Sequence, residues 1–156
     1  MVDVRSAVAA DIPELVRLRA LFAERPDSGW GPPPEGDAWR ERCAESIAEQ
    51  LFRDTMRIAV VDADAGRLAA CGMGVVDQRL PMPHNPDGRV GMVFGLVTDP
   101  AHRRRGHARA IMAELLAWFD GLGVERVNLT ATPEGDGIYR DLGFVDNPDP
   151  LLTRSR

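Results

Sequence analysis

The stretch that decides the fold runs from Val93 to Phe119 and reads VFGLVTDPAHRRRGHARAIMAELLAWF. Its first residues form an apolar run typical of a buried strand. Its last residues follow another rhythm, because apolar side chains recur at helical spacing from Ala108 to Leu122. A tight loop that contains arginines and a glycine lies between the two runs. The stretch therefore predicts a strand, a loop and an amphipathic helix in direct succession.

The loop before this helix predicts a site for an anion. The first turn of a helix leaves backbone N–H groups without partners and carries the positive end of the helix dipole, which suits phosphate. Gly106 would let the backbone approach the anion, and Ala108 keeps the next inward position small. Helix N-termini normally favour acids, yet this one is basic, so we expect a bound anion rather than a solvated surface cluster. The arginines concerned are Arg103, Arg104, Arg105 and Arg109.

The rest of the chain predicts a mixed sheet flanked by helices. Val2–Ala7 is typical of a strand, and the next helix is expected to have Asp11 as its N-cap and Glu14 in a capping box. The further predicted elements are a helix over residues 37–53, strands over 57–61, 68–76, 89–97 and 124–130, and a short helix over 136–142. A hairpin-rich centre followed by a β-α-β unit predicts one α/β domain that spans residues 1–156.

The composition excludes several kinds of chemistry. All 19 basic residues are arginine, so Schiff-base catalysis by lysine and a Walker-type phosphate loop are excluded. The net charge of -5 disfavours general binding to nucleic acid or to an anionic membrane. The two cysteines are far apart and are expected to be free thiols. The three histidines lack metal-ligand spacing, so we expect no metal.

The length and the N-terminus predict a compartment. A chain of 156 residues has room for a single core of workable size. No apolar run approaches the ~20 residues that span a bilayer, and the first residues lack the apolar region of a signal peptide. We therefore expect a cytoplasmic protein.

Two motifs resemble one known family. Arg103-x-x-Gly106-x-Ala108, preceded by Thr98-Asp99-Pro100, resembles the [Q/R]-x-x-G-x-[G/A] motif of the GNAT N-acetyltransferase superfamily. Tyr139-Arg140-Asp141-Leu142-Gly143-Phe144 resembles the family's Y-x-x-[LM]-G-F, and a helix and a strand separate the two motifs as expected. The resemblance implies a mixed, mostly antiparallel central sheet of six to seven strands, flanked by about four helices. Two of these strands are expected to splay apart at the coenzyme A site.

The resemblance also implies an activity and its residues. The family transfers an acetyl group from acetyl-CoA to a primary amine of a small molecule or peptide, by direct attack of the amine on the thioester. A backbone N–H near Leu96 or Val97 would polarise the thioester carbonyl, and Tyr139 would protonate the departing thiolate. The residues expected to bind the coenzyme are Leu96, Val97, Thr98, Arg103, Arg104, Arg105, Gly106, His107, Ala108, Arg109 and Thr132. Thr132 stands where many relatives have an asparagine.

The general base stays open at this point. Many relatives carry a glutamate in the strand before the first motif, but Gly91–Val97 contains no acid. The remaining candidates are Asp77, His84 and Asp99, or a chain of waters. Asp99 is expected instead to cap the turn into the motif.

The acceptor pocket is expected under the first two helices and the loops over residues 25–36 and 80–88. Trp30 would either form an aromatic wall there or simply pack. Four acids would either attract a cationic amine or belong to the surface: Glu24, Asp27, Glu35 and Asp37. The acceptor itself stays open between an antibiotic, a polyamine, an amino acid and a protein N-terminus.

Two other functions compete with catalysis. A non-catalytic module of the same fold would bind acyl-CoA as a sensor or scaffold, which the missing strand acid favours. A nucleic-acid-binding domain would use the arginine run, but one short basic cluster in an acidic chain lacks the charged stripe and aromatics of such a site. We therefore expect neither nucleic acid nor membrane as a partner, and a monomer or homodimer.

Overall fold

The structure is a computed structural model that describes residues 1–26 and 28–156. Its helices are α1 (Ile12–Ala23), α2 (Ala38–Gln50), α3 (His107–Gly121) and α4 (Asp136–Asp141), and its strands are β1 (Arg5–Ser6), β2 (Met56–Asp62), β3 (Leu68–Gln78), β4 (Arg89–Thr98) and β5 (Val127–Asn128). Short 3-10 turns precede α1 and follow β4. The expected number of helices, about four, is confirmed within the described residues.

The strands form one sheet in the order β1-β2-β3-β4-β5. Neighbouring strands are antiparallel except β4 and β5, which are parallel, so the predicted mixed, mostly antiparallel sheet is confirmed. The predicted count of six to seven strands is wrong, because the described residues form five. The tail after α4 adds none, and its Pro148 and Pro150 lack the N–H that a sheet ladder requires.

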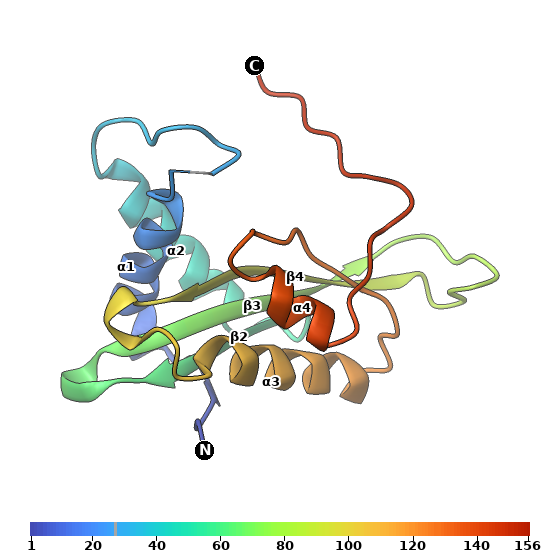
Figure 1. Ribbon diagram of the computed structural model, residues 1–156, viewed down its shortest axis with the longest axis horizontal. Helices are drawn as coiled ribbons and strands as arrows, with labels where there is room; N and C mark the ends of the chain where they lie inside the picture. Colours follow the sequence, from blue (N-terminus) through green and yellow to red (C-terminus); the bar gives the residue numbers. More distant parts are fainter. Residues whose placement is uncertain (27) are drawn as a thin grey trace.

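Helices cover both faces of the sheet, with α1 and α2 on one side and α3 on the other (Figure 1). Successive strand residues point to opposite faces, so the side chains of β2 divide between two cores. Ile58 and Val60 pack toward α1 and α2, whereas Ala59 and Val61 pack toward α3. Each helix layer thereby has its own buried apolar cluster.

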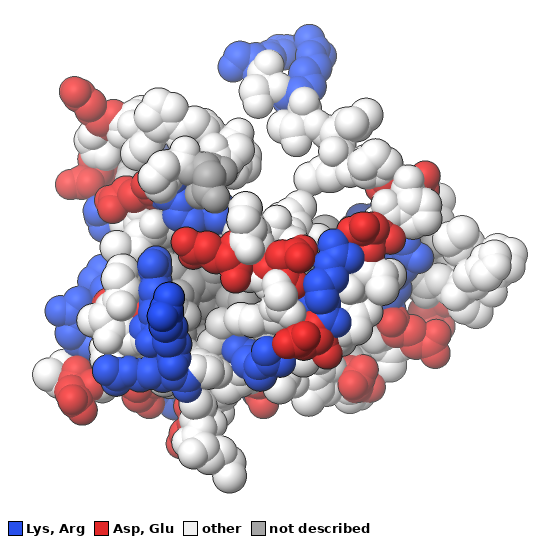
Figure 2. Space-filling view, viewed as in Figure 1, with Lys and Arg blue, Asp and Glu red and all other residues white. Residues whose placement is uncertain are grey.

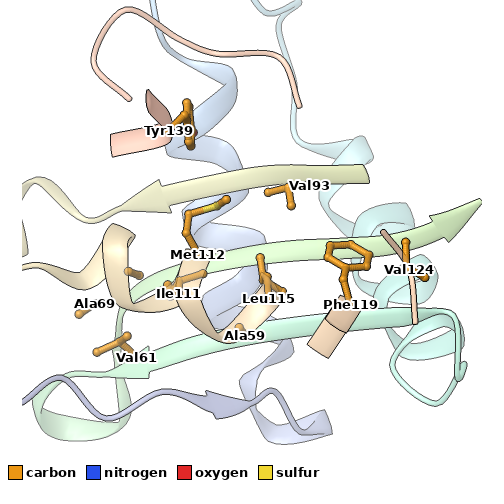
Figure 3. Close-up of a cluster of buried hydrophobic side chains, with 11 residues drawn as sticks. Ala59, Val61, Ala69, Val93, Ile111, Met112, Leu115, Phe119, Val124 and Tyr139 are labelled. Atoms are coloured by element: carbon orange, nitrogen blue, oxygen red, sulfur yellow. The ribbon is translucent and has the colours of Figure 1, made fainter. Parts of the chain in front are cut away.

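The cluster under α3 fixes the position of that helix (Figure 3). Ile111, Leu115 and Phe119 are fully buried there at helical spacing. Gly91 lets α3 lie close to the sheet, since a Cβ at that position would lie 2.7 Å from the ring of Phe119. A side chain at Gly72 would likewise lie 2.6 Å from Ile111. This close packing holds the start of α3 beside the end of β4.

Strand β4 has a bulge and then a free edge. Cys71 pairs with Val97 and Met73 pairs with Phe94, so two residues of β4 lie opposite Gly72. One of them, Gly95, has a φ of 63°, in the left-handed region. On the other side of β4, β5 pairs only with Gly91 and Met92. From Val93 onward the two chain segments diverge, and the expected splay is confirmed.

Asp11 is the N-cap residue of α1, as predicted, but its side chain makes no capping hydrogen bond with that helix, so the expected capping box with Glu14 is wrong. Asp11 lies in the 3-10 turn that precedes the helix, where it accepts a hydrogen bond from the N–H of Val8 at 2.8 Å. It also forms an ion pair with Arg5 at 2.8 Å. Glu14 accepts from the N–H of Leu68 at 2.9 Å, so it connects α1 to β3. Asp11 thus contacts residues just before the helix, whereas Glu14 makes a tertiary contact that sequence spacing alone does not reveal.

The structure bears on the two cysteines and on membrane-spanning helices. Cys43 and Cys71 are free thiols, as predicted, and burial raises the pKa of Cys71 to about 12. In the part of the chain that the structure describes, no helix has the length and apolar character needed to cross a membrane.

Candidate acetyl-CoA site

A cavity of about 590 Å³ opens where β4 and the segment after β5 diverge. Its walls come from the end of α1, the end of β4, the loop into α3, and the segment that enters α4. The predicted site residues that line it are Leu96, Val97, Thr98, Arg103, Arg104, Gly106, His107, Ala108, Arg109, Thr132 and Tyr139. Arg105, in the same loop, does not line it. A second cavity, of about 420 Å³ near the end of α3, contains none of the predicted residues.

The loop into α3 has the backbone geometry of an anion site. Arg104 and Gly106 have φ values of 62° and 81°, and left-handed residues in a loop turn backbone N–H groups toward one side. The first hydrogen bond of the helix runs from Ala110 N to Gly106 O at 3.0 Å, so the amides of residues 107–109 have no intrahelical partner. A Cβ on Gly106 would meet no atom within 4 Å, so the space above it is open.

The charge of the loop agrees with this geometry in part. Figure 2 shows blue side chains gathered beside a hollow in this face of the molecule. Arg103 and Arg104 line the cavity, and neither has an ion pair within residues 1–26 and 28–156. Arg109 differs, because it pairs with Asp141 at 2.9 Å. Asp141 thus compensates one of the arginines that were expected to require a bound anion.

His107 has an unused polar atom in the cavity wall. Its Nδ1 is buried and has no hydrogen-bond partner among the described residues. Burial, then the charges of His102 and Arg105, lower the pKa of His107. A phosphate bound near this imidazole would favour its protonated form. His102 also lines the cavity, with its ring centroid 6.4 Å from that of His107, and sequence reasoning missed it.

His107 leads to a prediction about pH. Its lowered pKa keeps the imidazole neutral in the free protein at pH 7, whereas a bound phosphate would raise the pKa, so binding should take up a proton. We expect the affinity for acetyl-CoA to rise as the pH falls from 8 to 6, by up to about tenfold for each unit of pKa change. Calorimetry in buffers of different ionisation enthalpy measures this uptake. The coenzyme's own titration is common to all variants, so unchanged uptake in His107→Asn would contradict the assignment.

Tyr139 lies on α4 with its side chain against the cavity. It is only 7% exposed, and its ring packs edge-on against Phe144 at a centroid distance of 6.1 Å. Burial raises the pKa of Tyr139, and the nearby positive charge of Arg25 partly opposes the change. The hydroxyl is therefore neutral at pH 7 and can donate a proton.

Gly135 leaves room for the tyrosine ring. A Cβ there would lie 2.8 to 2.9 Å from ring carbons and from the hydroxyl oxygen of Tyr139. We expect Gly135→Ala to displace the ring and lower the rate of acetyl transfer by about tenfold or more, since small misplacements of a reacting group are costly. Gly137→Ala is the matched control, because its Cβ would meet nothing within 4 Å. Equal rates in the two variants would show that the position of Tyr139 does not matter.

Thr132 makes a contact within the protein besides the predicted contact with the coenzyme. Its hydroxyl oxygen accepts a hydrogen bond from the N–H of Gly135 at 3.2 Å, which stabilises the turn into α4. The hydroxyl still lines the cavity, and its hydrogen remains available as a donor.

The candidate bases lie outside the cavity wall. Asp77 pairs with Arg79 at 2.8 Å, and neither it nor His84 lines the cavity. Asp99 accepts from the N–H of Ala101 at 2.9 Å, which confirms the predicted cap. This hydrogen bond, together with Arg17 at 2.6 Å, lowers the pKa of Asp99. A carboxylate held in this way is a poor proton acceptor.

Glu134 is the acid that does line the cavity. It lies between Thr132 and Gly135 in an exposed loop, and no spacing or periodicity distinguishes it there. Sequence reasoning had no signal that would have selected it.

The residues that cover the cavity differ in part from those predicted. Trp30 is 94% exposed and does not line the cavity, and neither do Glu24, Glu35 and Asp37. The fourth acid, Asp27, lies outside the described residues. The first helix supplies its C-terminal end instead, with Leu21, Phe22 and Arg25 on the wall.

The arrangement of the cavity residues agrees with a comparison of the chain with known protein families. A model of the acetyltransferase (GNAT) family matches residues 15–144. The chain belongs to this family. It is an acetyl-CoA-dependent acyltransferase that transfers an acetyl group to an amine.

This GNAT protein is similar to individual relatives in sequence and in structure. Glucosamine 6-phosphate N-acetyltransferase 1 of Oryza sativa subsp. japonica is 36% identical over 115 residues, which are 74% of this chain and 67% of the relative. The structure of a predicted acetyltransferase from Clostridium acetobutylicum with acetyl-CoA has a TM-score of 0.81 at 20% identity, covering 99% of this chain and 96% of that one. Glucosamine-6-phosphate N-acetyltransferase from Arabidopsis thaliana has a TM-score of 0.77 at 16% identity, covering 99% and 98%. At these identities, the two solved structures show a shared fold.

Proposed function

We propose that this cavity binds acetyl-CoA and catalyses N-acetylation of a small-molecule or peptide amine. The observation that carries the proposal is that one cavity wall contains the loop of the first motif and Tyr139, the residue that opens the second motif. Residues 103–109 would hold the pyrophosphate, mainly through backbone amides. The free edge of β4 at Leu96–Thr98 would run beside the pantetheine arm, and Thr132 would contact it from the other side.

The reaction would proceed by direct attack. The nitrogen of a neutral amine forms a bond to the thioester carbonyl carbon, and a backbone N–H near Leu96 or Val97 stabilises the oxygen as it gains charge. The C–S bond then breaks, and Tyr139 gives its proton to the departing thiolate. The nitrogen, positively charged after its attack, loses its second proton and becomes a neutral amide, and that proton restores the tyrosine hydroxyl. The bulge of β4 lies beside these residues, and bulges commonly re-aim groups at active sites.

Glu134 is the proposed acceptor of the amine proton. An alkyl amine with a reference pKa of ~10 is mostly protonated at pH 7 and must lose a proton before attack. Glu134 lines the same cavity as Tyr139, and strand β4 carries no acid from Gly91 to Val97. Proton transfer through a water to this carboxylate would leave the amine free to react.

The wider assignments belong to the same proposal. Residues 1–156 would act as one domain in the cytoplasm, as a monomer or homodimer, without a metal. The family match over residues 15–144 supports a single domain. Glucosamine 6-phosphate, named for one relative, supports a primary amine as acceptor.

A thiol-release assay with a panel of primary amines tests the proposed function. We expect coenzyme A to be released only when acetyl-CoA and a suitable amine are both present. The chain has no lysine, so acetylation of its own side-chain amines cannot add background. Tight acetyl-CoA binding with no turnover across the panel would favour the sensor or scaffold function instead.

A further inference from the structure

Arg25, just after the C-terminal end of α1, is held in a defined orientation on the cavity wall. Its Nε donates a hydrogen bond to the carbonyl oxygen of Phe22 at 3.2 Å. Its guanidinium lies over the ring of Phe22, 4.3 Å from the centroid. These contacts use Nε and one face of the group, so the two terminal nitrogens remain available as donors. The side chain is half-buried and lines the cavity.

An arginine within α1 shows how Arg25 differs. Arg17 is paired with Glu14 at 2.7 Å and with Asp99 at 2.6 Å, so its charge is compensated within the fold. Within residues 1–26 and 28–156, Arg25 has no carboxylate partner. A planar guanidinium with free donors matches a phosphate or a carboxylate.

The position of Arg25 points to the acceptor rather than to the coenzyme. Its positive charge acts on Tyr139, at the proposed reacting end of the cavity. The phosphates of acetyl-CoA are separated from its thioester by the uncharged pantetheine arm, and the loop at residues 103–109 already suits them. Glu134 lines the same cavity and would attract an ammonium group. The wall thus offers a positive and a negative group to one acceptor.

We propose that Arg25 binds an anionic group of the acceptor, so that the physiological substrate carries a phosphate or carboxylate besides its amine. This inference rests on the proposed function and narrows its substrate class. Polyamines and polycationic antibiotics, which carry no such anion, would then be poor acceptors.

Matched acceptor pairs test the inference. Comparing kcat/KM for glucosamine 6-phosphate and glucosamine tests recognition of a phosphate. The same comparison for alanine and alaninamide tests recognition of a carboxylate. We expect kcat/KM to favour the anionic member of at least one pair. Arg25→Gln should lower kcat/KM for that anionic acceptor by about 10- to 100-fold more than for its neutral partner, and leave the Kd of acetyl-CoA unchanged. Arg25→Lys should restore part of the loss.

Arg40→Gln is the matched control. Arg40 also lies beside an aromatic ring, with its guanidinium 5.3 Å from the centroid of Trp39, and it pairs with Asp37 outside the cavity wall. An effect of the same size in this variant would overturn the inference. A weaker affinity of Arg25→Gln for acetyl-CoA would also overturn it, because Arg25 would then bind a coenzyme phosphate. An equal loss on the neutral and anionic acceptors would do so as well.

A binding measurement separates this inference from the proposed function. The same acceptors are titrated by calorimetry into protein saturated with coenzyme A. Preferred binding of the anionic member, lost in Arg25→Gln, would support the anion site even if no amine were acetylated. If the anionic and neutral members of both pairs bind equally, the anion site is wrong, whatever the turnover.

Discussion

Replacing Gly106 with valine is expected to weaken acetyl-CoA binding by at least about 100-fold while the chain stays folded. The glycine has a φ of 81°, where a β-branched side chain costs about 1–3 kcal/mol of strain. Its Cβ position faces open space, so valine would not clash with the protein. The side chain would instead occupy the space that the pyrophosphate needs. Calorimetric titration measures the affinity, and circular dichroism checks the fold.

Gly143→Val is the control for backbone strain. Gly143 also has a positive φ, of 94°, and a Cβ there would meet nothing within 4 Å. It lines the second cavity and not the proposed acetyl-CoA site. The two variants should lose comparable stability, and only Gly106→Val should lose affinity. Equal affinity in both variants would show that the coenzyme phosphates bind elsewhere.

Replacing Tyr139 with phenylalanine is expected to lower kcat by about 10²- to 10⁴-fold, the usual contribution of a positioned acid. Phenylalanine keeps the ring that packs against Phe144, so the fold and the Kd of acetyl-CoA should change little. Single-turnover measurements of acetyl transfer isolate the chemical step. If the rate is the same as in the wild type, Tyr139 is not the acid that protonates the thiolate.

The proposed coenzyme side of the site could be predicted because its residues are local. Gly106, the arginines around it and the following helix adjoin one another in the sequence, and the glycine stands where the loop has a positive φ. Tyr139 was found through a second short motif, and Thr132 through its position where many relatives have an asparagine. The cap by Asp99 could be predicted for the same reason, since its partner Ala101 lies two residues away.

The acceptor side could not be predicted in this way. Phe22 and Arg25 reach the cavity because α1 packs across β4, a contact between segments far apart in the sequence. Glu134 has no periodic neighbour that would distinguish it from other exposed acids. The length of β5 also depends on its partner, and β4 offers it only Gly91 and Met92. These features arise from packing, which a single sequence does not specify.

A thermal-shift titration tests whether the cavity between β4 and α4 binds acetyl-CoA. Wild type and Gly106→Val are measured in parallel with acetyl-CoA, and with ATP and NAD as controls. A ligand at about 100 times its Kd stabilises the folded state by about 2.7 kcal/mol, which for a domain of this size raises the Tm by roughly 5–10 °C. We expect this shift for wild type with acetyl-CoA but not with ATP or NAD, and we expect it to be lost in Gly106→Val. No shift with acetyl-CoA, or equal shifts with ATP and NAD, would contradict it.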